Sequence, residues 1–183
     1  MADINSDALG EIVAPAESRD IHALPPVADA RLITVIELLF FAYRDFTRDA
    51  DAILAKFSLG RAQHRVLHFV DRNPGLRVAD LLDILKITKQ SLAPVLKQLI
   101  DEGWIVQQMG VADRRERRLR VTPKGASLAR RLDRVQAERV AQALEACEAG
   151  HEGSVLSFLF AMINGSERGR VEALLPEPAE TGR

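Results

Sequence analysis

Apolar residues recur at steps of three and four along the stretch from about Ala28 to Lys56. This spacing places them on one side of a helix, which at 1.5 Å per residue is about 40 Å long. That is long for a helix that packs only on its own small domain. The apolar stripe consists of Ile33, Ile36, Leu39, Phe40, Tyr43, Phe46, Ile53 and Phe57.

Three shorter helices are predicted after it. The first begins at about Gly60 and ends at the turn Asn73-Pro74-Gly75. The second and third are separated by Lys86-Ile87, and Thr88 can cap the third, so this pair predicts a helix-turn-helix. Their apolar positions are Val66, Leu67, Phe69 and Val70, then Val78, Leu81, Leu82 and Leu85, then Leu92, Val95, Leu96, Leu99 and Ile100.

A β-hairpin is predicted next. Gly103 suits the left-handed residue that ends a helix, and Trp104-Ile105-Val106 reads as a short strand with Trp104 as a core anchor. Arg118 to Val121 would be its antiparallel partner, with Gly110 to Arg117 forming the tip. The fold class is therefore mainly α with a small β-hairpin.

Helical periodicity returns at Thr122, which can act as a cap with Pro123 as the first helical residue. Its apolar positions predict a long helix to about Ala149, followed by a break and a final apolar helix from Val155 to Ile163. Beyond Gly165 the Gly, Glu and Pro content predicts a mobile tail. The apolar positions of the long helix are Leu128, Leu132, Val135, Val140, Leu144 and Cys147.

Charge is distributed unevenly along the 183 residues, although the net charge is only -1. Nine basic residues against four acids give Lys86 to Lys124 a charge of +5, while six acids against one arginine give Met1 to Ala30 a charge of -5. The basic surface is therefore local. A single cysteine, no signal peptide and no apolar run of about 20 residues predict a cytoplasmic protein without a membrane partner.

An arginine run occupies the predicted hairpin. Guanidinium groups match phosphate geometry and are attracted to the negative potential of a narrow minor groove. A solvated surface is the alternative, but a hairpin that directly follows a helix-turn-helix favours contact with double-stranded DNA. The run comprises Arg114, Arg115, Arg117, Arg118 and Arg120.

The third short helix supplies candidate base contacts, with ordinary helix surface as the alternative. Pro94 complicates this helix. If Thr88 is the cap, Pro94 removes a hydrogen bond to Gln90 and costs about 3 kcal/mol, whereas a start at Ser91 would place the proline in the first turn. The candidates are Thr88, Lys89, Gln90, Ser91 and Lys97.

The order of elements resembles the MarR family of winged-helix transcriptional regulators over about Arg31 to Asn164. The resemblance rests on Leu99-x-x-x-Gly103-Trp104-Ile105, Asp113-Arg114-Arg115 and Leu119-x-Val121-Thr122-x-x-Gly125. Three residues depart from the family pattern. Arg77 stands where a capping Thr or Ser is common, Lys86 replaces a small turn residue, and Pro94 lies in the recognition helix.

The resemblance implies a homodimer built from the first and last helices, bound to an inverted repeat. It also implies that the recognition helix enters the major groove and the wing enters the minor groove. Asp113 and Arg115 match the family's Asp-x-Arg wing pattern, in which the arginine enters the groove and the aspartate orients it. Arg114, Arg117 and Arg118 complete the predicted wing contacts.

A cleft between the dimer helices and the DNA-binding lobe is where this family commonly receives small ligands. The candidates for it are Tyr43, Arg44, His64 and His68. The two histidines have metal-compatible spacing, but no third ligand is evident, so no metal or cofactor is predicted. Cys147 continues an apolar stripe, which favours a buried structural thiol over a redox switch.

These features predict a dimeric, ligand-responsive DNA-binding repressor. A winged-helix adaptor that binds protein is the alternative, and the absence of phosphate-loop, metal-cluster and nucleophile motifs disfavours an enzyme. The predicted organisation is an acidic flexible tail (1–27), a dimerisation helix (28–57), the winged helix-turn-helix domain (58–122), dimerisation helices (123–164) and a flexible tail (165–183).

Overall fold

The computed structural model describes residues 29–109, 116–147 and 150–176. The chain divides into two compact units, one up to Ala137 and one from Glu138. The elements are α1 (Ala30–Ala55), α2 (Arg61–Arg72), β1 (Leu76–Arg77), α3 (Val78–Leu85), α4 (Lys89–Asp101), β2 (Ile105–Met109), β3 (Arg117–Val121), α5 (Pro123–Glu145), α6 (Glu152–Ala161) and α7 (Gly165–Glu172). This order confirms a mainly helical fold with a small sheet.

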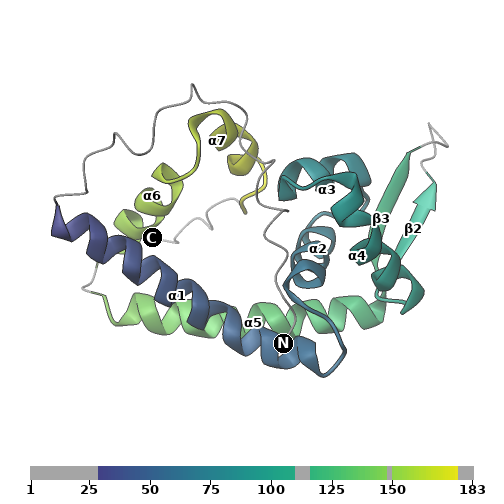
Figure 1. Cartoon of the computed structure of the whole chain (residues 1–183), viewed down its shortest axis with the longest axis horizontal. Coiled ribbons are helices and arrows are strands. Elements are labelled where there is room, and N and C mark those ends of the chain that lie inside the picture. The colour runs from purple at the N-terminus through teal and green to yellow at the C-terminus, as the bar shows by residue number, and fades with distance from the viewer. Residues whose placement is uncertain (1–28, 110–115, 148–149, 177–183) are drawn as a thin grey trace, which may run out of the picture. The chain divides into compact units, whose positions relative to one another are not determined.

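The core of the first unit lies where α2, α3 and α4 meet the hairpin formed by β2 and β3. Figure 1 shows these three helices gathered beside the hairpin. Burying each large aliphatic side chain contributes about 1.5 to 3 kcal/mol, so these positions dominate the stability of the unit. The fully buried residues include Leu54, Val66, Leu67, Val70, Leu81, Leu99, Ile105, Leu119 and Leu132.

The sheet has three strands in the order β1-β3-β2, so β3 is central. β2 pairs antiparallel with β3 in a register that places Gln107 opposite Leu119. β1 pairs antiparallel with the other edge of β3, so that Leu76 lies opposite Leu119 and Arg77 lies opposite Arg118. The sequence predicts the hairpin but not β1, because two residues carry no periodicity.

The corner between the wing and α5 follows the predicted pattern. Gly103 has φ +72°, the left-handed conformation expected where α4 ends. The hydroxyl of Thr122 donates to the carbonyl of Gly103 at 2.7 Å and accepts from the amide of Gly125 at 3.0 Å. Trp104 is buried, and its ring packs edge-on against Phe57 with centroids 5.3 Å apart. One threonine therefore joins the strand to the helix.

The two ends of α1 have different environments within the first unit. Its C-terminal part is in the core, where Ala50 and Leu54 are fully buried. Its N-terminal part is exposed, although the sequence there is strongly apolar. The exposed large side chains are Leu32, Ile33, Val35, Ile36, Leu38, Phe40, Phe41 and Tyr43.

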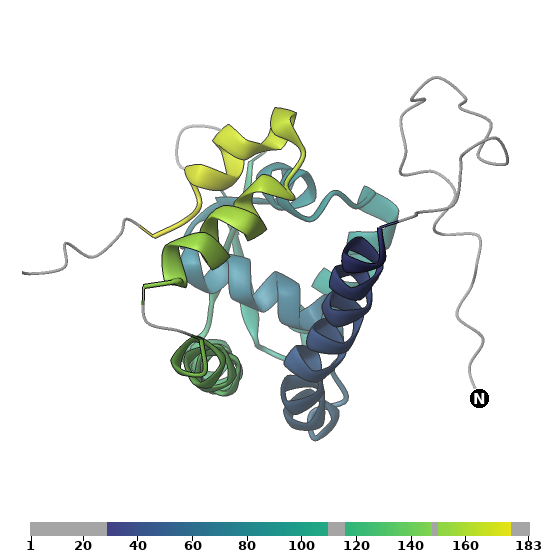
Figure 2. The same ribbon diagram turned by 90° about the vertical axis from the view of Figure 1, so that its left-hand side faces the viewer.

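The C-terminal part of the chain differs from the sequence prediction in two respects. α5 is one uninterrupted helix, seen nearly along its axis in Figure 2, but it ends at Glu145 rather than near Ala149. Cys147 therefore lies beyond the helix and is exposed, which corrects the expected buried thiol. Residues 165–172 form α7 instead of a mobile tail.

α7 is held by a side chain at its own centre. Arg168 donates from Nε to the carbonyl of Ile163 at 3.0 Å and from its terminal nitrogen to the carbonyl of Ala161 at 2.7 Å. These carbonyls lie at and just beyond the end of α6, where helix carbonyls lack intrahelical partners.

Within the described residues, no helix combines the length and the apolar character needed to cross a membrane.

Candidate nucleic-acid interface

The turn between α3 and α4 sets the direction of the recognition helix. Lys86 adopts a left-handed conformation with φ 51° and ends α3, with its amide donating to the carbonyl of Leu82. The amide of Ile87 donates to the same carbonyl at 3.4 Å. The turn thus closes tightly without a glycine, although a left-handed non-glycine residue costs on the order of 1 kcal/mol.

Thr88 is the N-cap of α4, as one of the two sequence readings requires. Its hydroxyl oxygen accepts from the amide of Ser91 at 3.1 Å and lies 3.0 Å from the Ser91 hydroxyl. Both hydroxyls therefore serve the helix start, while Lys89 and Gln90 between them are exposed. Of the predicted contacts in this turn, Lys89 and Gln90 are therefore the two whose side chains form none of these capping hydrogen bonds.

Pro94 lies inside α4, exposed, because the helix begins after Thr88 and not at Ser91. Proline has no amide hydrogen, so the carbonyl of Gln90 receives no hydrogen bond from position 94. The buried side of the same helix carries Leu92, Leu96 and Leu99, which hold it against the core.

The second half of α4 is anchored on one side and charged on the other. The side chain of Gln98 accepts through Oε1 from Nε2 of Gln63 at 2.8 Å and donates from Nε2 to the carbonyl of Ser58 at 3.2 Å, so it connects α4 with the start of α2. Lys97 forms an ion pair with Asp101 one turn further along the same helix. Gln98 is thus a structural contact, whereas Lys97 remains on the open surface.

The cations of the wing that the structure describes lie on β3. Arg117, Arg118 and Arg120 are exposed, and successive side chains of a strand point to opposite faces. Of the predicted wing residues, Asp113, Arg114 and Arg115 lie outside the described residues. The structure therefore places Arg117 and Arg118 at the end of β3 that lies next to the wing tip, and it leaves the Asp-x-Arg pattern a prediction.

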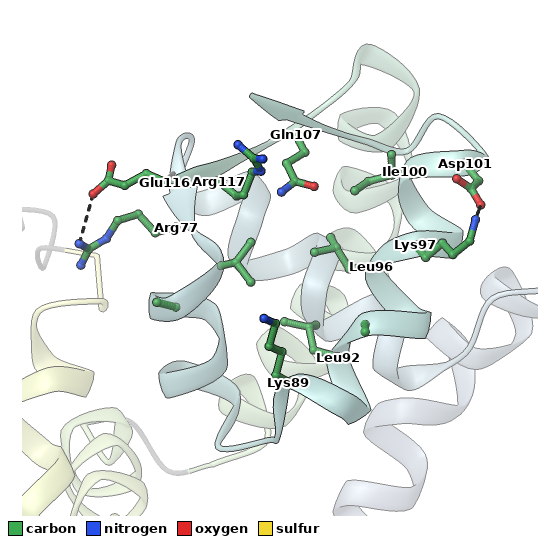
Figure 3. A pocket seen from close by; sticks show the side chains of 13 residues that line it. Arg77, Lys89, Leu92, Leu96, Lys97, Ile100, Asp101, Gln107, Glu116 and Arg117 are labelled. Atoms are coloured by element: carbon green, nitrogen blue, oxygen red, sulfur yellow. Dashed lines mark hydrogen bonds and ion pairs between the residues drawn. The ribbon is translucent and has the colours of Figure 1, made fainter. Parts of the chain in front are cut away.

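A groove of about 610 Å³ lies between α4 and the wing (Figure 3). Its apolar floor is formed by Leu92, Leu96 and Ile100 of α4 together with side chains from the start of α3. Four cationic side chains stand around it, from three different elements, with Gln107 of β2 on the same side. The cations are Arg77, Lys89, Lys97 and Arg117, and the acids on the rim are Asp101 and Glu116.

An ion-pair network crosses the rim of this groove. Arg77, the N-cap of α3, contacts both carboxylate oxygens of Asp80 at 2.7 and 2.6 Å. The same guanidinium lies 3.6 Å from Glu116, whose carboxylate also accepts from Arg118 at 2.8 Å. Asp80 and then Glu116 raise the pKa of Arg77 above its ordinary value. Arg77 therefore caps no amide with its side chain but connects α3 with the wing.

Sequence reasoning missed the role of Glu116. The Arg77-x-x-Asp80 spacing is a readable helix pair, since residues three apart share a face. The link to Glu116 has no such signal, because it depends on the pairing of β1 with β3. The sequence therefore fails to predict the contact between Arg77 and Glu116 for the same reason that it fails to predict β1.

The predicted effector residues lie on α1 and α2. His68 forms a 3.1 Å contact with Asp133 of α5, and His64 is half-buried one turn earlier on α2. Burial, and then the neighbouring His68, lower the pKa of His64. Tyr43 is exposed beneath the guanidinium of Arg61, whereas Arg44 pairs with its neighbour Asp45. Within the described ranges, no three His, Cys, Asp or Glu residues form a metal-binding group.

Comparison with known proteins gives concordant results. A model of the MarR family matches residues 57–116, which contain α2, β1, α3, α4 and β2. The HTH-type transcriptional regulator PetP of Rhodobacter capsulatus is 42% identical over 148 residues, which is 81% of this chain and 89% of that protein.

Two solved structures show the same fold at low sequence identity. A MarR transcriptional regulator from Methanosarcina mazei Go1 superposes with a TM-score of 0.61 at 23% identity, over 76% of this chain and 99% of that one. The S. aureus MepR-DNA complex superposes with a TM-score of 0.58 at 18% identity, over 70% of this chain and 94% of MepR.

Proposed function

This chain belongs to the MarR family of DNA-binding transcriptional regulators, which are not enzymes, and we propose that it acts as a homodimeric repressor. It binds an inverted-repeat operator and is released by a small ligand. The observation that carries the proposal is the cationic groove between α4 and the wing, which is lined by basic side chains from β1, α4 and β3. Lys and Arg at such a surface neutralise phosphates and set the register of the protein on the duplex.

The base contacts are assigned to the exposed start of α4. Lys89 and Gln90 enter the major groove, because recognition helices present their N-terminal residues to the base edges. Gln reads adenine with two hydrogen bonds, and Lys reads guanine or holds a phosphate. Lys97 contacts the backbone, exchanging its partner Asp101 for a phosphate. Thr88 and Ser91 support these contacts through the helix cap.

The wing contacts are assigned to its arginines. Arg115 enters the minor groove with Asp113 as its orienting partner, and Arg114, Arg117 and Arg118 hold the adjacent phosphates. A narrow minor groove concentrates negative potential, which favours an inserted guanidinium. The winged helix-turn-helix domain of residues 58–122 thus makes all direct DNA contacts.

The homodimer is formed by residues 28–57 and 123–164. The observation that supports this dimer is the apolar surface exposed on each of the two units. The first unit exposes the N-terminal half of α1, and the second exposes Leu156, Phe158 and Leu159 of α6 together with its C-cap Met162. Contiguous apolar patches of this kind mark protein interfaces. A two-fold dimer then presents two recognition helices to successive major grooves.

Ligand release acts through the spacing of those helices. The proposed effector cleft is lined by Tyr43, Arg44, His64 and His68, with His68 joined to Asp133 of α5. An effector shifts the equilibrium only if it binds more tightly to the dimer whose recognition helices are mis-spaced. Small aromatic or anionic molecules match the two histidines, the tyrosine and the arginine.

The first test is capture of genomic DNA fragments by the purified protein, followed by binding at several salt concentrations. If each subunit neutralises about four phosphates, the logarithm of the association constant falls with the logarithm of salt concentration with a slope of about -7. Selective binding to an inverted repeat over its scrambled version supports the repressor. Equal binding to both with a slope near zero contradicts it and favours the protein-binding adaptor.

Arg115→Ala tests the wing in the same assay. We expect it to weaken operator binding at least tenfold, because one groove contact is lost from each subunit. The matched control is Arg170→Ala, which removes an exposed arginine of α7, outside the segments assigned to DNA contact and to the dimer. Unchanged affinity of Arg115→Ala, or an equal loss in the control, would remove the wing from the mechanism.

A further inference from the structure

Two arginines stand directly opposite each other where β1 joins the wing. Arg77 and Arg118 are cross-strand partners, and like charges at such positions destabilise the pairing of their strands. β1 contains only two residues, so it has little else with which to hold its register. The junction needs a counter-charge.

Glu116 supplies that charge. Its two oxygens divide between the opposed arginines, one at 2.8 Å from Arg118 and one at 3.6 Å from Arg77. Arg77 is meanwhile fixed by its two contacts to Asp80, so its guanidinium is held in place on α3. The resulting line of charges runs from α3, through Arg77 and Glu116, to β3 (Figure 3 shows the contact between Arg77 and Glu116).

The place of Glu116 makes its role more than local stability. It lines the cationic groove, where a carboxylate repels the phosphates that the surrounding lysines and arginines attract. Glu116 is partly buried and its two arginine partners are exposed. Ion pairs this close to solvent contribute little to stability, typically 0 to about 1 kcal/mol, so holding the fold together does not explain an acid at this position. Fixing the position of the outer part of the wing relative to α3 does explain it.

We propose that Glu116 is a positioning residue for DNA recognition, which holds Arg77 and Arg118 together and thereby fixes the outer part of β3 relative to α3 and the recognition helix. The inference rests on the proposed DNA-binding function. It assigns to an acid, rather than to a cation, part of the selectivity for the operator over other DNA.

Comparing Glu116→Gln with Asp101→Asn distinguishes the loss of a positioning contact from the loss of a negative charge. Both substitutions remove one negative charge from the rim of the same groove, but Asp101 pairs with Lys97 on its own helix and connects no second element. Loss of an acid alone should tighten binding to operator and scrambled DNA alike. We expect Asp101→Asn to behave in this way and to leave the ratio of the two affinities within about twofold of the original chain.

Glu116→Gln should behave differently. Binding to scrambled DNA should tighten, whereas binding to the operator should weaken, so that the affinity ratio falls about fivefold, as expected from losing a pair that holds two elements. Arg77→Gln should also lower the ratio, and the double variant should lose less than the sum of the two single losses, because both substitutions remove the contact between Arg77 and Glu116. A thermal unfolding scan of each variant excludes loss of the fold as the cause.

Three outcomes would overturn the proposal in distinguishable ways. An unchanged or raised ratio in Glu116→Gln, with selective binding by the original chain, would overturn this inference alone. Additive losses in the double variant would show that Arg77 and Glu116 act separately and would also overturn it. Failure of the original chain to prefer any fragment over its scrambled version would overturn the proposed function together with the inference.

Discussion

Gly125 lies in the first turn of α5, against the backbone of the wing. A Cβ at this position would lie 2.1 Å from the carbonyl oxygen of Trp104, which accepts a hydrogen bond from the amide of Thr122 at 3.0 Å. We expect Gly125→Ala to lower the free energy of unfolding by about 1 to 3 kcal/mol, because strand and helix must separate to admit the methyl group. The urea midpoint at unchanged slope measures the loss.

Gly169→Ala is the matched control for that substitution. Gly169 lies within α7, and a Cβ there would meet nothing within 4 Å. Alanine in the interior of a helix is more favourable than glycine by about 0.5 to 1 kcal/mol, so the control should be neutral or stabilising. An equal loss in both variants would show that the close approach at Trp104 is not the cause.

His64 makes the stability of the fold depend on pH. Burial and the neighbouring His68 lower its pKa in the folded chain below the ordinary value of 6.5. The unfolded chain therefore binds a proton more readily, and stability should fall as the pH drops through 6.5 toward the lowered folded pKa, then level off. His64→Gln should flatten this part of the profile of melting temperature against pH. Parallel profiles for the two chains would contradict the assignment.

At the scale of the element, Pro94 weakens the recognition helix from within. Because Pro94 is exposed, Pro94→Ala removes little packing and restores an amide that can donate to the carbonyl of Gln90. We expect the free energy of unfolding to rise by about 1 to 3 kcal/mol, measured by urea unfolding. Ala93→Gly, at the exposed neighbouring position, should instead lower it by about 1 kcal/mol. A lower free energy of unfolding in Pro94→Ala as well as in Ala93→Gly would mean that Pro94 stabilises the helix.

The helices were predictable where periodicity and capping chemistry agreed. The three- and four-residue spacing predicted α1 to α4, and the caps at Thr88, Gly103 and Thr122 set boundaries that the structure confirms. α7 was not predictable, because its two glycines disfavour a helix and its support comes from Arg168, whose acceptors precede the helix. Local sequence patterns predict helix caps, but they do not predict contacts between a helix and the residues that precede it across a break in helical structure.

The candidate interface was predictable to a similar extent. Its elements and most of its cations follow from the helix-turn-helix pattern and the arginine run. The sequence could not show that Gln98 faces α2, or that Arg77 reaches Glu116, because both contacts depend on how the elements pack. Spacing along the chain fixes which residues share a helix face, whereas packing decides which face meets a neighbour.

At the scale of the whole molecule, the proposed homodimer depends on the apolar surface of α1. Phe40 has 72% of its surface exposed, the most among the large apolar residues of this helix. We expect Phe40→Glu to convert the dimer to monomers at micromolar concentration, because a carboxylate would be buried without a partner. Sedimentation measures the mass of each variant.

Ala52→Glu provides the control, since it introduces the same charge at an exposed position near the other end of α1. It should leave the dimer intact. Monomers in the original chain, or dissociation by both substitutions alike, would count against an interface at the N-terminal half of the helix. Dimer loss confined to Phe40→Glu should also abolish selective operator binding, because two half-sites require two linked recognition helices.

The exposed thiol of Cys147 gives each copy of the chain a single attachment point for a spin label, since no other cysteine occurs in the 183 residues. In a homodimer the two labels form one pair, so a pulsed resonance measurement would return one distance distribution per state. Recording it without DNA, with the operator and with a candidate effector would turn ligand release into a measurable change in separation. The same thiol requires reductant in every unlabelled experiment, because a disulfide between two copies would imitate the dimer.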